Sequence, residues 1–113
     1  MVTTIHVRSA RGFGRLRGLI GRPPPPSGEA LLLEPCRQVH TLFMRYAIDV
    51  VHLGSGGEVL AIQTLKPWRL GRYVLGAVRV LELRAGEADR LGLMLDVRPC
   101  LIEVGARVTT GNS

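Results

Sequence analysis

The chain has 113 residues, of which 46% are hydrophobic and only 4% are aromatic. This length suits one domain with a modest core of Leu, Val, Ile and Ala, and this hydrophobicity excludes a mainly disordered chain. The net charge is +6, and residues 1–28 supply +5 of it because they contain five arginines and no acid. We therefore expect a single domain over residues 1–113 with a basic N-terminal part.

The N-terminus lacks the pattern of a secretory signal, since no apolar run separates a basic start from a small-residue cleavage site. The longest apolar runs, such as Ala30–Leu33, are too short to span a bilayer. We expect a cytoplasmic protein with no membrane partner. In a reducing compartment Cys36 and Cys100 are expected to remain thiols.

The first predicted element is a strand over Val2–Val7, where apolar and polar residues alternate loosely. A short helix is predicted to follow, capped by Ser9 and ending at Leu19 or Ile20. Three glycines within it each cost the helix about 1 kcal/mol, so packing must supply most of its stability.

Residues 22–28 (RPPPPSG) are predicted to form a stiff, Pro-rich connection. Short apolar segments separated by Gly- and Pro-containing turns follow it, with one or two helical turns at Gly86–Leu91 and a frayed tail at residues 109–113. The class predicted is α+β: a compact, β-rich domain with a mixed or barrel-like antiparallel sheet and one or two short helices. The strands predicted are Glu29–Glu34, Val39–Phe43, Ile48–Leu53, Glu58–Thr64, Ala77–Leu83 and Pro99–Val104.

Several ordered pieces of the chain resemble the bacterial and archaeal family called Domain of Unknown Function 192. They are RGLIGR, VHTLFMRYAIDVVHL, GEVLAI, VLELRAGEA and LGL, which begin at residues 17, 39, 57, 80 and 91. The resemblance implies a compact, β-rich α+β domain and no particular reaction, because the family has no settled activity. Phe43 stands where the family usually has glycine before Met44, which adds bulk beside that methionine. Leu95 replaces the glycine that usually precedes Asp96 in a turn.

The segment CRQVHTLFMRYAIDVVHL places polar side chains within a strongly apolar stretch. Along Ile48–Leu53 successive side chains alternate between faces, and both faces are mostly apolar, which indicates a central strand. Asp49 is therefore expected to be partly buried, and a buried carboxylate needs partners because it loses several kcal/mol of solvation. These partners are backbone N–H donors, an arginine or a histidine, and the nearest candidates in sequence are Arg45 and His40. On this interpretation Asp49→Asn destabilises the fold by about 3–5 kcal/mol, because it leaves an arginine unpaired.

Glu82 poses the same problem in the apolar strand Ala77–Leu83. Two acids and Arg45 suggest one polar cluster inside the sheet. This cluster is either a structural salt bridge that determines strand register, or a ligand site in which Arg45 binds an anion that an acid orients. The candidate ligand-binding residues are His40, Met44, Arg45, Asp49 and Glu82.

Three functional hypotheses follow. The leading hypothesis is a non-enzymatic β domain that binds a small ligand or a protein partner in a polar cleft near His40, Arg45 and Asp49. The alternative is a hydrolase-type enzyme that uses Cys36 as nucleophile with His40 and Asp49. The second alternative is a weak RNA- or DNA-binding module that uses the N-terminal arginines. The arginines of the second alternative are Arg11, Arg15 and Arg17.

The chain contains no standard zinc spacing, phosphate-binding loop or dinucleotide fingerprint, so no metal or cofactor is expected.

Overall fold

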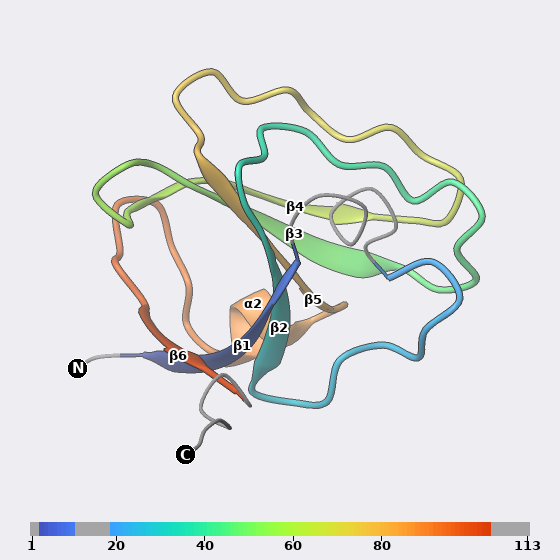
Figure 1. Ribbon diagram of the computed structural model, residues 1–113, viewed down its shortest axis with the longest axis horizontal. Coiled ribbons are helices and arrows are strands. Elements are labelled where there is room, and N and C mark those ends of the chain that lie inside the picture. Colours follow the sequence, from blue (N-terminus) through green and yellow to red (C-terminus); the bar gives the residue numbers. More distant parts are fainter. Residues whose placement is uncertain (1–2, 11–18, 105–113) are drawn as a thin grey trace, which may run out of the picture.

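The computed structural model describes residues 3–10 and 19–104 (Figure 1). Within these residues six strands form one mixed sheet in the order β4-β3-β5-β2-β1-β6, and one short helix packs on it. The elements are β1 (Thr4–Ala10), β2 (Glu29–Leu33), β3 (Ile48–Leu53), β4 (Val59–Leu65), β5 (Arg79–Arg84), α2 (Glu87–Arg90) and β6 (Cys100–Glu103). The predicted β-rich α+β class and mixed sheet are confirmed.

β1 pairs in parallel with both β2 and β6, whereas β3 pairs antiparallel with β4 and β5. β3 therefore has a neighbour on each side, and all six of its residues are buried. A strand buried on both faces reads as a nearly continuous apolar run, which is why its limits agree with the predicted ones. No helix in the described part of the chain is long and apolar enough to cross a bilayer.

Each face of the sheet buries its own apolar layer, since side chains alternate between the faces of a strand. On the first face, α2 and the segment after it cover the strands through Ala88 and Leu93. On the second face, Leu19 and the loop residues Val39 and Met44 cover the strands. The first layer includes Val51, Leu53 and Leu81, and the second includes Ile48, Val50 and Val80.

All the predicted strands except Val39–Phe43 are confirmed, with ends that differ by at most three residues from those observed. The start of the predicted first helix is wrong. Ser9 does not cap a helix, because it lies inside β1 and pairs with Leu32 of β2. The parallel pairing with β2 extends β1 to Ala10, beyond the predicted end at Val7. Most of the predicted first helix, at residues 11–18, lies outside the described residues, as does the tail at 109–113.

The predicted strand Val39–Phe43 is wrong. This segment makes a single isolated bridge between His40 and Leu70 and then turns. Phe43 has φ 67°, a left-handed conformation that cannot continue a strand. Two long loops, residues 34–47 and 66–78, instead run beside each other along one side of the molecule (green-blue and yellow in Figure 1). Apolar composition alone does not distinguish a strand from a buried loop.

Candidate functional site

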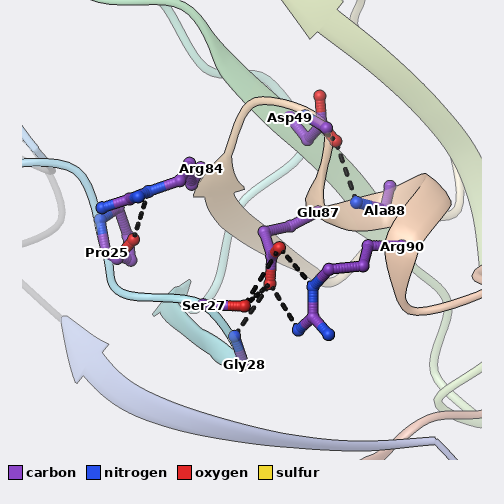
Figure 2. A network of polar contacts seen from close by, with 9 residues as sticks. Pro25, Ser27, Gly28, Asp49, Arg84, Glu87, Ala88 and Arg90 are labelled. Carbon is purple, nitrogen blue, oxygen red and sulfur yellow. Dashed lines mark hydrogen bonds and ion pairs between the residues drawn. The ribbon is translucent and has the colours of Figure 1, made fainter.

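Asp49 is 3% exposed and lies on the first face of the sheet. The Thr64 hydroxyl, directly opposite on β4, donates to Oδ1 at 2.8 Å. The backbone N–H groups of Gly86 and Ala88 donate to Oδ2 at 3.0 and 2.9 Å. Of the expected partners, backbone N–H donors are present and the arginine is not: the carboxylate receives donors from β4 and from the start of α2, one of which is visible in Figure 2. Asp49 thus joins α2 to the sheet.

Glu82 lies on the opposite face from Asp49. Its neighbours in register are Leu31 and Val50, both apolar, and the side chain is only 3% exposed. Its Oε1 is buried and has no hydrogen-bond partner. Burial raises the pKa of Glu82 to about 7. Burial also raises the pKa of Tyr46, and the nearby Glu82 carboxylate adds a smaller increase. The predicted single polar cluster is therefore wrong, because the sheet separates the two acids.

Met44 and Arg45 both line an open cleft of about 480 Å³ beside the Pro-rich connection. Met44 is buried at its floor and Arg45 is exposed. Its other walls come from Leu19–Pro24, Phe43 and Tyr46. His40 does not line this cleft, and its Nδ1 accepts the Leu42 N–H at 3.2 Å. The structure thus brings two of the five candidate residues, Met44 and Arg45, together in the cleft. Glu82 does not line it but lies near enough to Tyr46 to raise its pKa.

Arg22 also lines the cleft, and sequence reasoning missed it as a site residue. The Tyr46 hydroxyl donates to the Arg22 carbonyl oxygen at 2.8 Å and thereby holds the start of the Pro-rich connection against the loop of residues 34–47. Within residues 3–10 and 19–104, neither Arg22 nor Arg45 forms an ion pair, and no acid lines the cleft. The sequence signal was the arginine before four prolines, but nothing there indicated that Arg45 lies across from it.

The nucleophilic triad of the enzyme hypothesis is not assembled. Asp49 uses both oxygens on the first face, whereas Cys36 packs against the core of the second face. The Cys36 thiol donates to the Gln38 carbonyl at 3.3 Å. Across the described ranges no three His, Cys, Asp or Glu side chains cluster as metal ligands. The nucleic-acid hypothesis depends on Arg11, Arg15 and Arg17, which lie outside the described residues.

His52 is fully buried on the second face, and within the described residues neither ring nitrogen makes a well-aligned hydrogen bond. Burial lowers its pKa most strongly, while nearby backbone groups of Arg37 and Arg72 act in the opposite direction. A lowered pKa keeps this imidazole neutral near pH 7. His52 therefore serves as a packing residue beneath the two loops.

Glu87 anchors the Pro-rich connection to α2 (Figure 2). The Gly28 N–H donates to its carboxylate at 2.8 Å, the Ser27 hydroxyl at 3.2 Å and the Arg90 guanidinium at 2.7 and 2.9 Å. Arg90 and the backbone N–H lower the pKa of Glu87 to about 2 despite the opposing effect of burial. Nearby, Arg84 donates to the Pro25 carbonyl at 3.2 Å. One wall of the cleft is thus joined to the first face of the sheet.

Glu87→Gln is expected to destabilise the protein at pH 7 by about 1–2 kcal/mol, a value reduced because the exposed Arg90 is screened by solvent. The folded pKa lies below the ordinary value of 4.5, so this stabilisation is present above pH 4.5 and is lost as pH falls toward 2. Urea unfolding at about pH 7 and pH 3 measures both values. Asp89→Asn, an exposed acid of the same helix, is the control. Equal loss of stability by both variants would contradict the role of Glu87.

Comparisons with known proteins agree with this architecture. The family model of DUF192, described as an uncharacterized ACR, matches residues 2–98. A UPF0127 protein of Pyrococcus furiosus is 39% identical over 101 residues, which cover 77% of this chain and 85% of that protein.

Two solved structures share the fold. A protein of unknown function from Novosphingobium aromaticivorans has a TM-score of 0.73 and 21% identity, over 81% of this chain and 71% of that one. A proposed transcription regulator from Sinorhizobium meliloti has a TM-score of 0.70 and 22% identity, over 81% and 78%. At these identities the two structures support the fold alone. The family match over almost the whole described chain shows that this protein belongs to the DUF192 family.

Proposed function

We propose that this protein is a non-enzymatic binding domain whose ligand is a small amphipathic anion, such as a carboxylate or phosphate that carries an apolar group. The observation that carries the proposal is the cleft between Arg22 and Arg45. Among residues 3–10 and 19–104, Arg22 and Arg45 form no ion pair, and they line a mostly apolar space to which no described acid contributes. The proposed site keeps Arg45 of the polar cleft that the sequence predicted near His40, Arg45 and Asp49, and adds Arg22 in place of the other two residues.

The chemistry of the cleft suits such a ligand. A guanidinium presents a planar set of N–H donors that matches the oxygens of a carboxylate or phosphate. The floor of Leu19 and Met44 and the wall of Pro23 and Pro24 suit an apolar group, and methionine adapts to irregular shapes. A volume of about 480 Å³ lies within the range of small-molecule sites.

Glu82 is compatible with an anionic ligand because its pKa is about 7. Below that pH the carboxyl behind Tyr46 is mostly uncharged and does not repel an anion. Binding of an anion to the cleft is therefore expected to weaken as pH rises above 7, in addition to any change in the ligand itself.

Octanoate and octyl phosphate are suitable probes, with 1-octanol as the uncharged control. Titration followed by amide NMR shifts is expected to show binding of both anions, with shifts in residues 19–22 and 43–46. Arg45→Gln is expected to weaken binding about tenfold, because it removes a charge-assisted interaction of about 1.5–3 kcal/mol. Arg98→Gln removes an exposed arginine that does not line the cleft, and should leave binding unchanged. Equal affinity for octanol and octanoate, or shifts elsewhere, would contradict the proposal.

We also infer that the chain acts as one domain in a reducing compartment such as the cytoplasm. Cys100 is an exposed thiol, and no disulfide joins it to Cys36. Exposed thiols are typical of reducing conditions, whereas secreted domains usually pair them. Alkylation in intact cells, followed by mass spectrometry of the purified protein without reduction, tests this inference: an alkylated Cys100 is expected, and an unmodified, disulfide-bonded Cys100 would contradict it.

A further inference from the structure

The two neighbouring loops expose an unusual concentration of large apolar side chains. Six of the nine large hydrophobic residues that are exposed in the described chain lie on residues 34–47 and 66–78. At the centre, the rings of Phe43 and Trp68 pack with centroids 4.7 Å apart while remaining 65% and 55% exposed. Leu42, 38% exposed, precedes Phe43 in the first loop, and Leu70, 70% exposed, follows Trp68 by two residues in the second. We call Leu42, Phe43, Trp68 and Leu70 the apolar tip.

Buried hydrogen bonds hold the apolar tip in place. Thr41 is fully buried: its hydroxyl donates to the Lys66 carbonyl and accepts the Arg69 N–H at 2.8 Å. Its backbone N–H donates to the Arg69 carbonyl and its backbone carbonyl accepts the Trp68 N–H, both at 2.8 Å. Phe43 and Trp68 adopt φ of 67° and 61°, which is costly for bulky residues and is found mostly where function requires it. The fold thus presents both rings outward on a rigid base.

The charges around the apolar tip are mostly positive. The two loops contain five basic residues, all with exposed side chains, and one acid, Glu34, which begins the first loop and forms an ion pair with Arg79. None of the five forms an ion pair within the part of the chain that is described. A partner that matches this surface therefore offers an apolar region that the exposed side chains can enter and negative charge that faces the basic residues. The basic residues are Arg37, Arg45, Lys66, Arg69 and Arg72.

We propose that the apolar tip and its basic rim dock this protein on the surface of an anionic lipid bilayer. Peripheral binding of this kind needs no membrane-spanning run, since apolar side chains enter only the headgroup and upper acyl region while Lys and Arg meet lipid phosphates. This departs from the sequence-based expectation of no membrane partner, which was drawn from the short apolar runs and did not consider peripheral binding. The surface shares Phe43 and Arg45 with the anion cleft, whereas Leu42, Trp68 and Leu70 do not line that cleft.

Other occupants fit less well. In a symmetric dimer each surface meets its own copy, which would bring the two basic rims together. Single-stranded nucleic acid requires aromatic faces on which bases stack, whereas Leu42 and Leu70 have none and Phe43 and Trp68 pack on each other. A bilayer accommodates leucines and aromatic rings equally, and tryptophan favours its interface.

Trp68 is the only tryptophan of the chain, so its fluorescence reports on this surface alone. With vesicles of equal phosphatidylcholine and phosphatidylglycerol at low salt, the emission is expected to shift to the blue and the protein to sediment with lipid. Vesicles of phosphatidylcholine alone should give neither result, and high salt should reverse both. Phe43→Gly should reduce vesicle partitioning about tenfold, as loss of one buried aromatic side chain predicts. Glycine accommodates the φ of this position, so the variant is expected to fold.

Two variants separate this proposal from the others. Met94→Ser removes an exposed apolar residue from a different loop and should leave vesicle binding unchanged. Octanoate binding should persist in Leu70→Ser, because Leu70 does not line the cleft. The proposal is overturned by absent vesicle binding, by equal binding to both lipid compositions, or by a blue shift that appears without lipid as protein concentration rises. Quenching by single-stranded oligonucleotides without any vesicle binding would overturn it in favour of nucleic acid.

Discussion

Asp49→Ala is expected to lower the free energy of unfolding by about 3–5 kcal/mol. The substitution leaves the backbone N–H groups of Gly86 and Ala88 and the hydroxyl of Thr64 without their acceptor. The Ala88 N–H is buried, and an unsatisfied buried donor costs about 1–3 kcal/mol, whereas the exposed Gly86 and Thr64 lose less because water can reach them. The loss also releases the start of α2 from the sheet. Urea unfolding followed by circular dichroism measures the change.

Two further variants test the cause. Asp49→Asn retains an oxygen that can accept from both N–H groups, while its amide can donate to a rotated Thr64 hydroxyl. Its cost is therefore expected to be about 1 kcal/mol, below the cost expected if an arginine were the partner. Thr64→Val should cost about as much, since it removes one of the three donors. A loss of stability as large for Asp49→Asn as for Asp49→Ala would indicate that charge, and not acceptor geometry, holds α2 in place.

Glu82 is expected to make the protein less stable as pH rises. Its folded pKa of about 7 lies above the ordinary value of 4.5, so the folded state binds the proton more tightly than the unfolded state. Stability is therefore highest below pH 4.5 as far as this group is concerned, and it decreases as pH rises through 7. A shift of this size corresponds to about 3 kcal/mol.

Glu82→Gln should remove this dependence, since glutamine does not ionise. The variant is expected to be about 2–3 kcal/mol more stable than the unmodified protein near pH 8 and close to it near pH 5. Thermal or urea unfolding across that range gives the difference. Glu103→Gln alters an exposed acid of β6 and is the matched control. If Glu82→Gln is destabilising at both pH values, the carboxylate has a charged partner and the burial argument fails.

The central part of the fold follows from local patterns. Ile48–Leu53 is apolar on both faces, and only a strand between two neighbours uses such a sequence well. Glycines mark the hairpin before β4, and the segment after Gly86 forms the predicted helical turns as α2. Burial of Asp49 and Glu82 was also predictable, because each lies among apolar residues of a strand.

The tertiary structure decided which partners these residues meet. Strand alternation placed Asp49 and Glu82 on opposite faces only once β5 had paired with β3 in the observed register. The donors to Asp49 are mostly backbone N–H groups, which every residue except proline carries and which leave no trace in composition. The sequence therefore indicated that the carboxylate needs partners, but not which ones.

The two surfaces proposed for binding depend even more on long-range contacts. Arg22 and Arg45 are far apart in the chain and line one cleft because Tyr46 hydrogen-bonds to the Pro-rich connection. Phe43 and Trp68 meet because Thr41 joins two loops that apolar composition predicted partly as a strand. Apolar pattern and turn residues are local properties, so the sequence by itself determined the class and most strands. Loop pairing depends on hydrogen bonds between distant residues, and only the folded chain brings those groups together.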